Sequence, residues 1–148
     1  MSSVRTLPFA CLLLLACDSS HAPLSDEAPR RSPTKAATFT ISIRDGNGIE
    51  SPFRVGDLRK LTMEVRMAGA TPGPHPLRLD VLSPSGALYA QLPLSIDVGA
   101  AGDGIDSTDL QVAGTPIESY RQVGAWSFRL ARPGAAAPLA TAEAEIAE

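Results

Sequence analysis

The densest cluster of residues in this sequence that could bind a metal ion consists of aspartates. Four aspartates lie within thirteen residues, interspersed with Gly102 and Gly104: Asp97, Asp103, Asp106 and Asp109. Carboxylate oxygens on a loop are ligands that Ca²⁺ prefers. The spacing matches neither an EF-hand nor a repeat-type calcium loop, and aspartate is also common in turns and at strand ends. The segment is therefore predicted to be a solvated acidic loop, with no metal site and no cofactor.

Histidine offers little more. His75 is the only histidine in the part of the chain predicted to fold, because His21 falls in a polar stretch near the N-terminus. One histidine without cysteine partners is a poor start for a zinc site. A Ser-His-Asp arrangement needs an activated serine, but no Gly-x-Ser-x-Gly motif occurs and His75 stands between two prolines. No catalytic residue and no small-molecule substrate are predicted, and the protein is expected not to be an enzyme.

Cysteine chemistry is confined to one position. Cys17 directly follows an uncharged stretch, residues 6–16, which Arg5 precedes. An apolar run of about ten residues is too short to span a bilayer, which takes about twenty. It has the length of the apolar region of a secretory signal peptide. Cys11 lies inside that leader and would be removed with it, so Cys17 would have no disulfide partner in the exported chain.

The stretch Leu14-Leu15-Ala16-Cys17 resembles the lipobox of bacterial lipoproteins. In that family the cysteine thiol receives a diacylglyceryl group, the leader is cut before it, and the new amine is usually acylated, with chains such as palmitate. Leu15 departs from the small or hydroxyl residue that is usual there. The resemblance implies a signal peptide at 1–16, lipidation of Cys17, and a place in the bacterial cell envelope. A plain secreted protein is the alternative.

Lipidation would make the membrane a partner of this chain. Each buried methylene contributes about 0.8 kcal/mol, and stable anchoring takes two chains or more. Asp18 resembles the inner-membrane retention signal of enterobacterial lipoproteins, but sorting rules differ between bacterial groups, so inner and outer membrane both stay open. Residues 17–36 are then the lipidated cysteine and a flexible tether, because their Ser, Pro, Ala and charged residues cannot bury enough apolar surface to fold.

The remaining chain, 37–148, is predicted to be one β domain. Apolar residues alternate with polar ones, the pattern of half-buried strands. Seven segments are expected to be strands: 39–43, 61–67, 77–81, 88–98, 105–112, 126–130 and 139–146. Three prolines predict a loop at 70–76, and Pro93 is expected to interrupt the fourth strand. Trp126 and Phe128 share a face with Leu130 and are predicted to be core, whereas Phe53, Tyr89 and Tyr120 are possible surface aromatics.

Composition agrees with an all-β domain and excludes some functions. The 148 residues include 13 prolines and 12 glycines, which suit many short elements separated by turns. Aromatic residues make up only 5%, so the core must be mostly aliphatic, and the net charge of −3 gives no attraction to nucleic acid. The predicted fold is an immunoglobulin-like β-sandwich of about seven strands.

Four segments in order resemble immunoglobulin-like and macroglobulin-type sandwich domains of bacterial envelope proteins. They are residues 53–57, 80–86, 124–130 and 138–142, the third of which reads Gly-Ala-Trp-Ser-Phe-Arg-Leu. The resemblance covers the chain from about residue 53 to its end, and it lacks the cysteine pair and tyrosine corner of antibody domains. It implies a fold and no chemistry.

The function expected from these observations is non-catalytic binding. We expect a membrane-anchored envelope lipoprotein that acts as a binding or adaptor module for another envelope protein, through loops or a strand edge. Tyr120 and Arg121, beside Pro116-Ile117-Glu118, are the predicted contact surface, together with Tyr89. The alternative is a glycan- or peptidoglycan-binding module that uses the same tyrosines for stacking.

Overall fold

The computed structural model describes residues 36–148, so the predicted signal peptide, Cys17 and the tether before Ala36 lie outside the described residues. Within this range the chain forms eight strands and one short helix. They are β1 (Thr38–Asp45), β2 (Phe53–Arg54), β3 (Lys60–Ala68), β4 (Gly73–Leu82), β5 (Leu88–Val98), β6 (Asp103–Gln111), α1 (Pro116–Ser119), β7 (Gly124–Ala131) and β8 (Ala140–Ala147).

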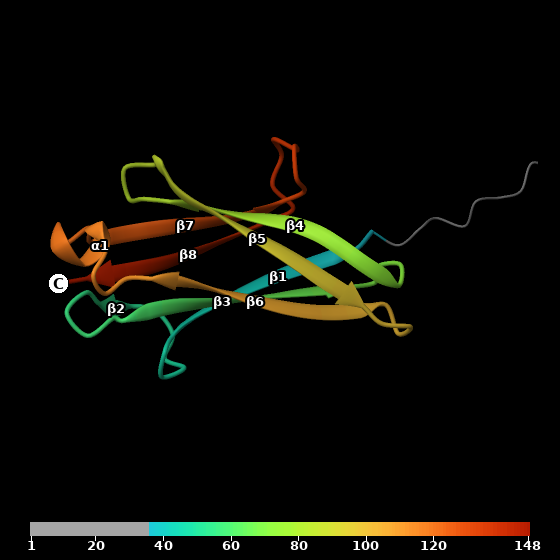
Figure 1. Cartoon of the computed structure of the whole chain (residues 1–148), viewed down its shortest axis with the longest axis horizontal. Coiled ribbons are helices and arrows are strands. Elements are labelled where there is room, and N and C mark those ends of the chain that lie inside the picture. The colour runs from blue at the N-terminus through green and yellow to red at the C-terminus, as the bar shows by residue number, and fades with distance from the viewer. Residues whose placement is uncertain (1–35) are drawn as a thin grey trace, which may run out of the picture. The chain divides into compact units, whose positions relative to one another are not determined.

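The strands build two sheets, which Figure 1 shows as two layers. One sheet has the order β1-β3-β6 and is antiparallel throughout; the other has the order β2-β8-β7-β4-β5, in which only the β2–β8 pairing is parallel. The predicted all-β, immunoglobulin-like sandwich is thus confirmed, with eight strands in place of about seven. The additional strand is β2, which has only two residues and was not expected.

The core is formed by the inward-facing residues of both sheets. Every second residue of β3 is buried, from Leu61 to Met67, as the alternating sequence predicted. Trp126 and Phe128 are fully buried, which confirms their prediction as core residues. Phe53, predicted as a surface aromatic, is only 3% exposed, so that prediction was wrong. Its strand pairs with the end of β8, and this pairing turns the ring into the core.

Residues 73–76 of the predicted loop are strand, which corrects the prediction there, whereas residues 70–72 lie outside the strands. Pro74 and Pro76 belong to β4, and β5 continues through Pro93. Pro93 lies opposite Arg78, and because proline has no N–H, these two residues cannot exchange N–H···O bonds. Pro74 and Pro76 are an even number of residues from Arg78, so their ring nitrogens also face away from β5. On that side of β4 no strand is paired with them, because β7 pairs with β4 only from Arg78 onward. No ladder bond is lost.

Gly104 lets the chain cross from one sheet to the other. The turn after β5 is closed by a hydrogen bond from the Gly99 N–H to the Asp103 carbonyl at 3.1 Å. A Cβ at Gly104 would lie 2.5 Å from Cγ2 of Ile96 and 2.8 Å from the carbonyl oxygen of Asp97. Only glycine permits this approach, and Figure 1 shows β5 reaching from its own layer toward β6.

Hydrogen bonds close the turn after β1 and the turn between β4 and β5. The Asp45 carboxylate accepts hydrogen bonds from the N–H groups of Asn47 at 2.8 Å and Ile49 at 2.7 Å. The Ile49 bond is the largest cause that lowers the pKa of Asp45. Between β4 and β5, the Gly86 N–H donates to the Ser83 carbonyl at 2.8 Å. Among residues 36–148, no helix has the length and apolar character needed to cross a membrane.

Replacing Gly104 by alanine should destabilise the domain by about 1–3 kcal/mol, because the added methyl forces β5 and β6 apart. The matched control is Gly56→Ala, where nothing lies within 4 Å of the new Cβ. This control should change stability by less than about 0.5 kcal/mol. Urea unfolding followed by the fluorescence of Trp126, the only tryptophan, measures both. Equal unfolding midpoints for the two variants would contradict the close approach.

Candidate functional site

The predicted contact residues lie around one end of the sandwich. Tyr120 directly follows α1, and its side chain is 76% exposed, more than any other large hydrophobic residue described. Arg121 adopts a left-handed backbone conformation, with φ of 46°, and its Nη2 lies 3.4 Å from Oε2 of Glu148. Tyr89 lies on β5 and is half-buried. Its ring meets Trp126 edge-on, with 5.2 Å between ring centroids.

The segment that carries Tyr120 is held rigidly despite its shortness. Ile117 of α1 is fully buried and anchors the helix in the core. The Gly114 N–H donates to a carboxylate oxygen of Glu118 at 2.6 Å, and the Trp126 indole N–H donates to the Gln122 carbonyl at 3.0 Å. A buried indole N–H without an acceptor is costly. The core tryptophan therefore fixes the position of the chain just after Tyr120.

A groove of about 420 Å³ runs beside this segment. Its walls are the β4–β5 turn on one side and the chain before β7 on the other: Ser83, Pro84, Ser85, Ala87, Leu88, Tyr89, Gln122 and Val123. The two walls approach closely at Gly124, where a Cβ would lie 3.0 Å from Cβ of Pro84. The structure brings Tyr89 into the groove, whereas Tyr120 and Arg121 follow α1 just outside its lining.

Leu88 is the surface residue that sequence reasoning missed. It lies an even number of residues from the inward-facing Leu92 and Leu94, so the alternation of side chains along a strand would place it in the core. The register shifts between Val81 and Leu82, which pair with Ala90 and Leu88 respectively, and Tyr89 is the extra residue. Such a bulge changes the direction of the residues beside it. Leu88 is consequently 56% exposed, at the groove beside Tyr89.

The four clustered aspartates lie on strands, which contradicts the predicted acidic loop and agrees with the strands predicted at 88–98 and 105–112. Asp97 is in β5, and Asp103, Asp106 and Asp109 are in β6. Successive residues of a strand face opposite sides, which puts Asp106 and Asp109 on different faces of the sheet. Asp106 accepts the Ser95 N–H at 3.0 Å and the Ser107 N–H at 2.8 Å. Among residues 36–148, no three metal-ligating side chains are grouped to hold an ion.

Asp109 is instead part of a polar cluster on the outer face of β3 and β6. Its carboxylate accepts hydrogen bonds from Lys60 Nζ and Thr62 Oγ1, both at 2.7 Å. These hydrogen bonds hold the pKa of Asp109 below its ordinary value of 3.8, and the bond from Lys60 has a larger effect than the bond from Thr62. Lys60 and Asp109 are 42% and 49% exposed, so this pair contributes little to stability.

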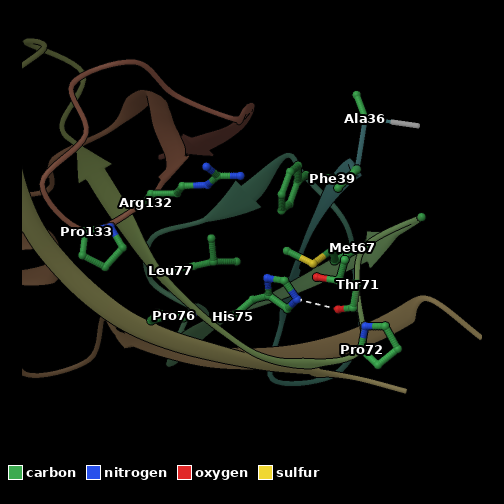
Figure 2. Close-up of a pocket in the computed structure, with 13 residues that line it drawn as sticks. Ala36, Phe39, Met67, Thr71, Pro72, His75, Pro76, Leu77, Arg132 and Pro133 are labelled. Carbon is green, nitrogen blue, oxygen red and sulfur yellow. Dashed lines mark hydrogen bonds between the residues drawn. The ribbon is translucent and has the colours of Figure 1, made fainter. Parts of the chain in front are cut away.

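His75 lines a larger groove, of about 850 Å³, at the beginning of β1 (Figure 2). The ring nitrogen Nε2 lies 2.8 Å from the Thr71 carbonyl oxygen, so it carries the proton and donates. Phe39, Met67 and Leu77 form the apolar part of the lining, and Arg132 brings a cation. The residues that line the groove include no carboxylate to orient the histidine as a base. The side chains around His75 are thus mostly apolar.

Comparison with known proteins identifies no family. No family model and no curated protein match the chain. Parts of two solved glycosidases are similar in shape: β-glucosidase 3B from Thermotoga neapolitana (14% identity, 74% of this chain and 16% of that one, TM-score 0.44) and the β-D-glucoside glucohydrolase from Trichoderma reesei (13%, 76%, 19% and 0.42). This chain spans less than a fifth of the length of either enzyme. At these TM-scores the similarity assigns neither family nor activity.

Lys60→Met should return the pKa of Asp109 toward 3.8, because the main bond that favours the carboxylate is lost. Since the folded pKa lies below the unfolded one, the stabilisation is present above pH 3.8 and is lost as pH falls through the folded pKa. Removing Lys60 should therefore cost a few tenths of a kcal/mol at neutral pH, and less in acid. NMR titration of the Asp109 carboxyl measures the shift. Arg66→Met, which removes the partner of Glu64, is the control that should leave Asp109 unchanged.

Proposed function

We propose that this protein is a lipid-anchored, non-catalytic binding module of the bacterial cell envelope, which contacts another envelope protein through the groove beside Tyr120. The observation that supports this most is the exposure of Tyr120 and Leu88, 76% and 56%, on a rigidly held part of the domain. Lipidation at Cys17 rests on the sequence alone, since that residue lies outside the described part. The anchor would hold the domain at the membrane, and the groove would select the partner.

The energetics of protein contacts favour this surface. Tyrosine is enriched among the residues that dominate binding energy, because it buries a large ring with few rotatable bonds. Leu88 adds apolar area next to the half-buried ring of Tyr89. Ile117 and the Trp126–Gln122 hydrogen bond hold the backbone in place before any partner arrives. Little conformational entropy would then be lost on binding.

Glycan or peptidoglycan binding is the second candidate. The exposed ring of Tyr120 favours it, because sugars stack on aromatic faces. Tyr89 contributes less to such a platform, since its ring already packs edge-on against Trp126. Binding of the full chain to purified cell wall, lost in Tyr120→Ala and independent of any protein, would replace the protein-partner proposal by this one.

Tyr120→Ala and Leu88→Ala should each weaken capture of the partner by about fivefold or more, the effect of removing a residue that contributes more than about 1 kcal/mol. Tagged full chain is cross-linked in its own cells, purified from detergent extracts, and its co-purifying proteins are quantified against wild type. Ile49→Ala, which removes a side chain about as exposed as Leu88 (58% against 56%) from the turn after β1, is the matched control. Unchanged capture by both groove variants would refute the proposed contact surface.

Cys17→Ser should abolish incorporation of a fatty acid analogue, because the acceptor thiol is gone. Cys11→Ser is the control, since that cysteine lies within the predicted leader, and it should be labelled as wild type is. In-gel fluorescence of the labelled full chain, normalised to its amount, gives the readout. Equal labelling of Cys17→Ser and wild type would show that no lipid is attached at this position.

A further inference from the structure

The sheet edges of this domain are protected unequally. Unpaired N–H and C=O groups at an edge strand invite another strand to pair, and proteins block this with prolines, charges, bulges or coverage. The β5 edge contains Pro93, and its Ser95 N–H is taken by Asp106. The β6 strand carries three aspartates. The end of β8 is covered by β2, and its Glu145 N–H donates to Ser51 Oγ at 2.7 Å.

Among the described residues, the β1 edge has none of these devices between Thr38 and Ile43; its charged residues, Arg44 and Asp45, come at the end of the strand. Residues 38–43, Thr-Phe-Thr-Ile-Ser-Ile, include no charge, proline or glycine. The Asp45 N–H donates to the Ile49 carbonyl, away from β3, and backbone direction alternates along a strand. The N–H and C=O groups of Phe39, Ile41 and Ile43 therefore point outward from the sheet. None of these six groups has a hydrogen-bond partner among residues 36–148.

Open space lies beside this edge. A gap of about 270 Å³ separates β1 from β8, which belongs to the other sheet. Its apolar lining is Ile41, Ile43 and Ala142. Two carboxylates also line it: Glu143, and Glu50, whose Oε1 lies 3.7 Å from Nε of Arg44. An extended chain paired with β1 would direct every second side chain toward this gap. The lining fits an apolar side chain there and a basic one near the carboxylates.

We propose that β1 accepts an added β-strand from a partner protein, whose extended segment alternates apolar and polar residues and includes lysine or arginine. The ladder would be formed by the backbone groups of Phe39, Ile41 and Ile43. Half-buried Ile41 would become covered by the apolar residue of the incoming strand. This surface is separate from the Tyr120 groove and does not depend on lipidation at Cys17.

The test uses a synthetic peptide, Lys-Thr-Val-Thr-Val-Thr-Lys, added at millimolar concentration to the full chain in detergent micelles. NMR should show slower amide exchange at Phe39, Ile41 and Ile43, with Thr40 and Ser42 already protected by β3 in the free chain. Two N-methylated forms of the peptide carry the methyl groups on alternate residues. Strand addition requires that one form binds and the other does not, because only one set of N–H groups faces β1.

Ile41→Pro removes one outward N–H without breaking the β3 ladder, and it should weaken peptide binding about fivefold or more, the loss expected for a backbone hydrogen bond. Ile105→Pro is the matched control, because it removes an outward N–H from β6, the other edge of the same sheet. Equal binding of both N-methylated peptides, or no protection at millimolar peptide, overturns the proposal. The proposal is also overturned if the free chain sediments as a dimer and the Ile41→Pro variant as a monomer, since the edge would then be occupied by a second copy.

Discussion

The burial of Trp126 is the constraint on which most of this structure depends. The ring lies fully inside the sandwich, and its N–H must find an acceptor there, which the Gln122 carbonyl provides. That single bond fixes the chain between α1 and β7. Tyr89 packs its ring edge against the same indole, so one core residue positions both walls of the groove. The candidate binding surface is thus a consequence of how the core is closed.

The fold could be predicted because its signals are local. Alternation in β1, β3 and β7 and turn residues such as Asp45 determine a strand and its ends within a few positions. The proline-rich start of β4 could not be predicted, because whether a missing N–H matters depends on which side of the strand is paired. That is decided by where β7 stops, more than forty residues later. Phe53 was misjudged for the same reason, since its burial requires pairing with the end of β8.

The candidate site was only partly visible in the sequence. Tyr120 stands next to proline, charge and turn residues, which are surface signals, and it is exposed as expected. Leu88 was hidden, because a bulge at Tyr89 reverses the direction that alternation predicts. The aspartates of β6 were misjudged as well, because a composition typical of loops suggested a loop where the chain forms a strand. On this strand Asp109 accepts hydrogen bonds from Lys60 and Thr62, and Asp106 accepts one from Ser95.

The two surfaces proposed here differ in physical character. The Tyr120 groove offers side chains of defined shape, whereas the β1 edge offers backbone groups and so would recognise an extended chain with little dependence on its sequence. A module with both would hold one partner through shape and another through strand pairing, which suits an adaptor. Tethering to a membrane would raise the effective concentration of the domain near membrane-bound partners.

Site-specific photo-cross-linking in living cells tests the central claim most directly. A photoreactive amino acid placed at position 120 of the full chain should yield one predominant protein adduct in the membrane fraction. The same amino acid at Ile49, which is 58% exposed on the turn after β1, should not yield that adduct. Adducts of the same identity and amount from both positions, or none from position 120, would contradict the account of this domain as a binding module that acts through the Tyr120 groove.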